Sequence, residues 1–135
     1  DYVWMKNYNH LTIVIMVGAM SGATGAVTVK QATSAAGGSA KDVTVAKRFL
    51  CTATSTASDT FVDTTVTSNT WTMPATANLV NIVEIDSRDL DVANAFEYVA
   101  VNITASGNAA DRGAVLYILS EPRFQVADSL PTAIV

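Results

Sequence analysis

The chain has little of what a catalytic site requires. Its 135 residues include one histidine, His10, and one cysteine, Cys51, and only 15% of them are charged. His10 belongs to no recognisable motif with a nucleophile. A single cysteine cannot form an internal disulfide. The sequence therefore predicts no catalytic, cofactor-binding or metal-binding residues and indicates a non-enzymatic structural or binding protein.

Basic clusters and long apolar runs are also missing. The net charge is −4, and the densest basic spot is the pair Lys47-Arg48. A nucleic-acid-binding surface would need a basic patch. The longest apolar stretch, residues 11–20, is half as long as the roughly 20 residues that a membrane-spanning helix needs. We expect neither nucleic acid nor a membrane as a direct partner.

What the sequence does contain is short β-prone segments. Half of the residues are hydrophobic, and clusters of Gly, Ser, Asn and Thr separate the apolar runs. Residues 11–17 are almost continuously apolar, which is typical of a strand buried on both faces or central in a sandwich. Residues 26–32 alternate small apolar with polar side chains, as in a half-buried strand. Residues 98–104 form the clearest strand pattern of all.

About eight such segments, each bounded by turn residues, predict an all-β fold. Residues 43–51 are expected to form one irregular strand, and residues 113–119 a central strand. The only helical signal is a single turn over residues 89–94, with Asp89 placed to cap it. We predict one domain over residues 1–135, an antiparallel β-sandwich of jelly-roll type with at most one short helical turn.

Acidic residues gather in one place and raise the question of a metal site. Calcium takes oxygen ligands at such spacing, but Arg88 lies inside the cluster and the EF-hand pattern is absent. Helix capping and an Asp–Arg pair are the preferred interpretation. The cluster consists of Glu84, Asp86, Asp89 and Asp91.

Aromatic residues suggest a second kind of site. Exposed aromatic rings could form a platform for carbohydrate, although core or interface packing is the commoner use. The candidates are Trp4, Phe61, Trp71 and Tyr98. A carbohydrate-binding or adhesin-type module therefore stays open as an alternative function.

Both ends of the chain carry apolar residues that a solvated tail would not need. We expect one or both ends to pack on a neighbouring subunit; the alternative is that the C-terminal tail folds back over an open end of its own sandwich. The predicted interface residues are Tyr2, Val3, Trp4, Leu130, Ile134 and Val135. The chain starts at Asp1 without a methionine, so we expect a processed or partial form of a longer chain.

Three segments resemble small structural proteins of tailed bacteriophages. They are Met5-Lys6-Asn7-Tyr8-Asn9-His10 leading into an apolar strand, residues 25–33, and residues 85–99, where an acidic Asp-Leu-Asp turn precedes an aromatic pair that opens a strand. The resemblance implies a capsid decoration or cement protein at the phage capsid surface, in the virion. Its implied partners are the major capsid protein and further copies of itself. A tail- or fibre-associated virion protein is the alternative within this group.

Overall fold

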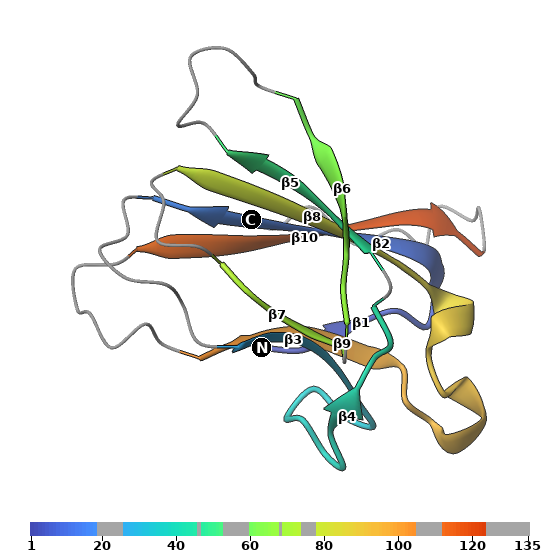
Figure 1. Cartoon of the computed structure of the whole chain (residues 1–135). Helices are drawn as coiled ribbons and strands as arrows, with labels where there is room; N and C mark the ends of the chain where they lie inside the picture. The colour runs from blue at the N-terminus through green and yellow to red at the C-terminus, as the bar shows by residue number, and fades with distance from the viewer. Residues whose placement is uncertain are drawn as a thin grey trace, which may run out of the picture.

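Ten β-strands in two antiparallel sheets make up most of the residues that the computed structural model describes (Figure 1). Figure 1 shows the two sheets as two layers. We call the upper layer sheet B and the lower layer sheet A; their strands are given below. The prediction of an all-β sandwich is confirmed. The structure describes residues 1–18, 26–45, 47–52, 60–67, 69–73, 78–104 and 112–123.

Sheet A is built around β3, which has three partner strands. Its strands run in the order β1 (Val3–Trp4), β9 (Tyr98–Ile103), β3 (Ala26–Ala32) and β4 (Lys41–Asp42), with β7 (Thr70–Thr72) also paired to β3. Sheet B runs in the order β10 (Gly113–Pro122), β2 (Tyr8–Val17), β8 (Leu79–Asp86), β5 (Lys47–Thr52) and β6 (Val62–Thr65).

The strand pairs are nested within one another along the chain. Strand β2 pairs with β10, β3 with β9, and β5 with β8, all antiparallel. The chain thus resembles one long hairpin whose two arms are rolled into both sheets. This nesting is the arrangement of a jelly roll.

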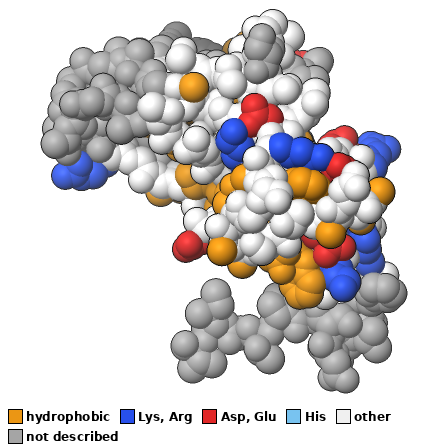
Figure 2. Space-filling model, turned by 90° about the horizontal axis from the view of Figure 1, so that it is seen from below, with side chains coloured by type: hydrophobic (Ala, Val, Ile, Leu, Met, Phe, Trp, Pro, Cys, Tyr) orange, Lys and Arg blue, Asp and Glu red, His pale blue; other side chains and the backbone are white. Residues whose placement is uncertain are grey.

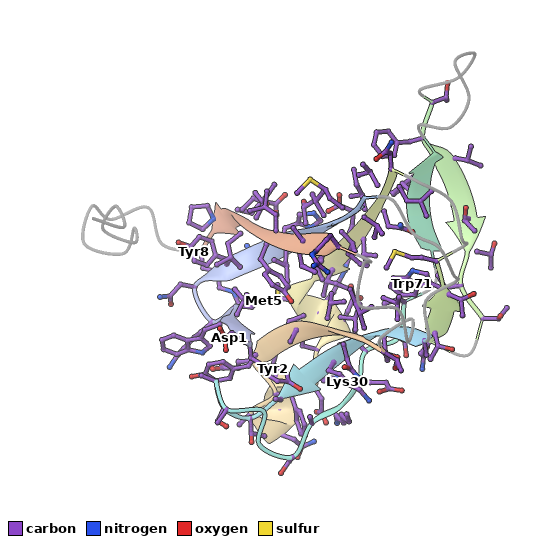
Figure 3. The ribbon with its side chains drawn as sticks, turned by 90° about the vertical axis from the view of Figure 1, so that its left-hand side faces the viewer. Asp1, Tyr2, Met5, Tyr8, Lys30 and Trp71 are labelled. Atoms are coloured by element: carbon purple, nitrogen blue, oxygen red, sulfur yellow. The ribbon has the colours of Figure 1, made fainter. Side chains whose placement is uncertain are left out.

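The core forms because each strand places alternate side chains between the sheets. In β2 the buried residues are Leu11, Ile13, Ile15 and Val17, while the even-numbered side chains point to the other face. Sheet A contributes buried valines from β3 and β9. Figure 3 shows Met5 and Trp71 between the two layers, where both belong to the same apolar cluster. Trp71 belongs to β7 of sheet A, and Met5 lies between β1 and β2.

Two expectations about strands were wrong. Residues 43–51 do not form one irregular strand, because residues 43–45 lie in no strand and only residues 47–51 belong to β5 of sheet B; β4 of sheet A has already ended at Asp42. Val43 and Val45, buried in the core, lie between these two strands. Residues 113–119 were expected in a central strand, but β10 is the edge strand of sheet B. Strand β10 is apolar because one of its faces packs against the core, while its other face carries exposed apolar side chains.

The helical content is two single 3₁₀ turns, η1 (Ser87–Asp89) and η2 (Val92–Asn94), where one turn was expected. Asp89 is not the N-cap residue that the sequence suggested, because η1 begins earlier and its N-cap is Asp86. Asp89 is the third residue of η1, and its carboxylate accepts the backbone N–H of Asp86 at 2.8 Å. Within the described part of the chain, no helix is long and apolar enough to cross a membrane.

Candidate functional site

The outer face of sheet B is apolar across four strands. The strand register sets Leu116 of β10 beside Val14 of β2, Val14 beside Ile82 of β8, and Ile82 beside Phe49 of β5. Side chains of directly paired residues lie on the same face of a sheet. These four apolar side chains therefore form one row on the side that faces away from the core.

Flanking rows widen this apolar surface. Met16 is paired with Val80 on one side of the central row, and Ile118 stands beside Thr12 on the other. The exposed fractions are 49% for Leu116, 45% for Ile118, 42% for Met16 and 38% for Phe49. We call the seven residues Val14, Met16, Phe49, Val80, Ile82, Leu116 and Ile118 the outer patch.

The outer patch contributes nothing to the core, because the core residues of the same strands point the opposite way. Single exposed apolar residues are ordinary in soluble proteins, whereas a contiguous exposed patch marks an interaction site. Four of the seven residues of the outer patch are β-branched, and none of the seven is charged.

A polar cluster borders the outer patch at one end of β2 and β8. His10 Nδ1 lies 3.0 Å from Asp86 Oδ1, and His10 Nε2 lies 2.5 Å from Glu84 Oε2. Thr12 donates its hydroxyl to the same Glu84 oxygen at 2.8 Å. Arg88 donates to the other oxygen of Asp86 at 2.6 Å. The cluster links the two central strands of sheet B on their outer face.

The two carboxylates favour the charged form of His10. An ionised carboxylate only accepts hydrogen bonds, so both ring contacts are hydrogen bonds when the imidazole carries two N–H groups. The hydrogen bond to Asp86 is the largest effect on the pKa of His10 and raises it. Burial, the second-largest effect, lowers the pKa, and the hydrogen bond to Glu84 raises it again, so the net direction is upward. The hydrogen bonds from His10 and then Arg88 lower the pKa of Asp86.

A shallow, open depression lies beside this cluster. Its walls are polar and come from β2, β8, β10 and the turn η1: Asn9, Asp86, Ser87, Arg88 and Glu121. Within the described residues, no three His, Cys, Asp or Glu side chains are arranged to hold a metal ion. The two ring nitrogens of His10 point at different carboxylates, so the three groups do not converge on one point.

The acidic residues singled out in the sequence act in capping and ion pairs. Asp86 pairs with Arg88, and Asp89, the last residue of η1, accepts the backbone N–H of Asp86 and so completes the capping of η1. Asp91 accepts from Asn94 and from Lys41, and these hydrogen bonds, Lys41 first, lower the pKa of Asp91.

The outer face of sheet A is different in character. Figure 2, which views this face, shows Lys or Arg side chains beside acidic ones, with hydrophobic side chains between them. One such pair is Lys30 with Asp42, whose charged atoms are 2.5 Å apart. Paired charges of both signs make this face more polar than the outer patch.

Two of the four candidate aromatic residues meet on sheet A. The rings of Trp4 and Tyr98 are nearly parallel, with centroids 5.8 Å apart, and Trp4 is 46% exposed. Glu97 accepts the indole N–H at 3.1 Å, and the Lys6 ammonium lies 5.5 Å from the Trp4 ring centroid. Trp71, by contrast, is buried in the core, and exposed Phe61 precedes β6 of sheet B.

The predicted interface residues at the N-terminus have different surroundings. Val3 is paired with Val99, and the Tyr2 ring lies against Gly37, so both are partly covered by sheet A and its hairpin. Trp4 offers the most open surface of the three. The predicted residues at the other end, Leu130, Ile134 and Val135, lie outside the described residues.

No protein-family model matches the chain, and no curated protein or solved structure matches it at a significant level. The function has to be argued from the geometry of the site itself.

Sequence reasoning missed the outer patch, although a signal for it was present. A half-buried strand alternates polar with apolar residues, whereas residues 13–17 of β2 are apolar at every position. That continuity was interpreted as a strand buried on both faces or central in a sandwich, and β2 does lie inside sheet B, between β10 and β8. It also fits a strand with one face in the core and the other on a binding surface.

Proposed function

We propose that this protein is a non-enzymatic structural protein that binds neighbouring protein subunits through the outer patch of sheet B. The observation that carries the proposal is the apolar row of Leu116, Val14, Ile82 and Phe49 across four strands. Covering such a row with another protein surface removes apolar area from water, at about 25 cal/mol per Å².

The surroundings of the outer patch support a protein partner. The centre of a protein interface is depleted of charge, and its rim is polar. The outer patch has no charged member, and the His10–Glu84–Asp86–Arg88 cluster borders it at one end. The cluster would provide the rim, with hydrogen-bonding groups that set the orientation of the partner.

The specific form that we propose is a capsid decoration protein of a tailed bacteriophage. The resemblance of three segments to phage structural proteins supports it, as does a β-sandwich whose exposed apolar surface lies on one broad sheet. Binding across neighbouring major capsid protein subunits would add contact area that must be broken before the head can open. Many weakly bound copies would together reinforce the shell.

A binding experiment with matched variants tests this proposal. The probe is empty shells assembled from the major capsid protein encoded with this chain, and the readout is cosedimentation over a range of concentrations. The test variant is Met16→Lys in the outer patch; the control is Asn102→Lys, which adds the same charge to an exposed position of sheet A. We expect Met16→Lys to weaken binding at least about tenfold, because it leaves a charge in an apolar contact.

Asn102→Lys should bind as the unchanged protein does, and both variants should keep their melting temperature. Equal binding by both variants would contradict a role for the outer patch. Failure of the unchanged protein to bind shells at micromolar concentration would contradict the capsid proposal, while leaving other protein partners for the patch.

The stacked pair Trp4 and Tyr98 favours one second candidate, a carbohydrate-binding module. An exposed indole beside a hydrogen-bonding carboxylate, Glu97, can stack on a sugar ring and bind its hydroxyls. A glycan array with the unchanged protein and Trp4→Ala tests it. Glycan binding that Trp4→Ala abolishes and Met16→Lys leaves intact would favour this function over the first.

A further inference from the structure

Strand β10 lacks the features that usually protect the edge of a sheet. It is ten residues long, and its pairing with β2 is continuous from Gly113 to Ser120. Its only charged residue, Glu121, and its only proline, Pro122, stand at its last two positions. Natural proteins shorten, charge or bend exposed edge strands because their free N–H and C=O groups recruit further strands.

The direction of these backbone groups follows from one hydrogen bond. Gly18 donates its N–H to the Arg112 carbonyl at 3.0 Å, and these two residues are opposite one another in the β2–β10 register. Backbone groups alternate in direction along a strand, so the even-numbered residues of β10 bond β2. Gly113, Val115, Tyr117 and Leu119 therefore turn their N–H and C=O groups outward. Among the described strands, none pairs with this side of β10.

We infer that two copies of this protein pair through their β10 strands, antiparallel and about a two-fold axis at Tyr117. The pairing joins two B sheets into one of ten strands. In this pairing, residues opposite one another must point to the same face of the joined sheet. The residues that exchange backbone hydrogen bonds must be odd-numbered, because their N–H and C=O groups are the ones that point away from β2. An axis at any residue of β10 satisfies both conditions. The axis at Tyr117 is the one that pairs the stretch from Gly113 to Glu121 over its full length, and it sets Leu116 opposite Ile118 of the second copy.

The strand is complementary to itself in charge as well as in hydrogen bonding. Arg112 immediately precedes β10 and Glu121 lies near its end. In the antiparallel pair, the Arg112 end of each copy lies beside the Glu121 end of the other, so opposite charges meet twice. A parallel pair would instead bring like charges together. Self-complementarity of this kind is what a two-fold interface requires.

The apolar surface also continues across the proposed junction. Leu116 and Ile118 belong to the outer patch and lie at its β10 border. Pairing of the two edges would set the two outer patches side by side on one face. The inference does not depend on the proposed function, although a doubled patch would strengthen any binding through it.

A charge-swap experiment on the full chain tests both the dimer and its register. Leu116→Lys/Ile118→Lys would place like charges opposite one another at two positions, whereas Leu116→Lys/Ile118→Glu would place opposite charges there. Both variants lose the same apolar side chains. Sedimentation velocity should show a dimer for the unchanged chain and for the Lys/Glu variant, and a dissociation constant at least about tenfold higher for the Lys/Lys variant.

Other outcomes would overturn the inference. A monomeric unchanged chain at 100 μM, or equal association by the two variants, contradicts pairing in this register. Deletion of residues 124–135 gives a second readout, because it tests whether the chain's own tail covers the edge. If only the truncated chain dimerises, the tail is the occupant and the inference is wrong.

Discussion

The backbone N–H of Val101 in sheet A donates to the Tyr117 hydroxyl of sheet B at 2.9 Å. Tyr117 belongs to the edge strand β10, and its ring reaches across the sandwich to β9. Strand β1 pairs with β9 only at Tyr98 and Val99, so Val101 lies beyond the reach of that ladder. The phenol thus supplies an acceptor that no strand provides at this point, and it connects the two sheets.

Tyr117→Phe tests the value of this connection. The substitution keeps the ring but removes the acceptor, leaving a partly buried N–H without its bond. We expect the free energy of unfolding to fall by about 1 kcal/mol. Urea denaturation followed by fluorescence measures it. A loss below roughly 0.3 kcal/mol would show that water replaces the hydroxyl without cost.

Gly37→Ala should destabilise the hairpin between β3 and β4. Gly37 has a φ of 82°, a conformation that costs a residue with a side chain about 1–2 kcal/mol. An added Cβ would also come within 2.8 Å of the Tyr2 ring. Thermal denaturation of Gly37→Ala and of Tyr2→Ala/Gly37→Ala separates the two causes. The cost should be smaller in the Tyr2→Ala background without vanishing, and a neutral Gly37→Ala would contradict both causes.

His10 should make stability depend on pH near neutrality. Its pKa is higher in the folded than in the unfolded chain, where it is about 6.5. The ion pairs with Asp86 and Glu84 therefore contribute fully below pH 6.5, and this contribution is lost as pH rises through the higher folded value. Asp86 acts in the opposite sense, because its lowered pKa gives stability that is lost as pH falls below about 4.

His10→Gln is the variant that checks this. Its melting temperature should change less than that of the unchanged protein between pH 6 and pH 9, and the two curves should approach each other at high pH. Parallel curves over this interval would show that the His10 cluster does not respond to pH.

Two neighbouring residues of β2 should differ greatly in how much stability is lost when each is replaced by alanine. Ile15 is 1% exposed in the core, whereas Met16 is 42% exposed in the outer patch. Ile15→Ala should cost about 2–4 kcal/mol of unfolding free energy, because it removes buried methyl groups and leaves a cavity. Met16→Ala should cost less than about 0.5 kcal/mol. A large loss for Met16→Ala would mean that the outer patch serves the fold and not a partner.

The strands could be predicted from local patterns, since each depends on β-branched residues and on the turns beside it. Strands β2, β3 and β9 lie where residues 11–17, 26–32 and 98–104 indicated. The assignment of each strand to one of the two sheets could not be predicted from these local patterns. Residues 43–51 look like one segment because Val43 and Val45 are as β-prone as their neighbours, yet the chain changes sheet there.

The candidate site was harder to predict than the fold. His10 lies 74 and 76 residues from its two carboxylate partners, so no spacing in the sequence indicates the cluster. The outer patch depends on the register of four strands, which side-chain pattern alone does not fix. The interface residues predicted at the ends of the chain include Trp4, which is exposed. The outer patch is a larger apolar surface, and its residues lie in the middle of the strands of sheet B.

The nested strand order has a consequence for synthesis of the protein. Strand β2 ends at Val17, yet its edge partner β10 begins only at Gly113, so β10 leaves the ribosome long after β2. Until then β2 has an unpaired edge and an apolar outer face next to it. Such long-range pairing folds slowly and exposes edges to aggregation. Shortening the chain before Gly113 should therefore yield insoluble protein, even though nine of the ten strands remain.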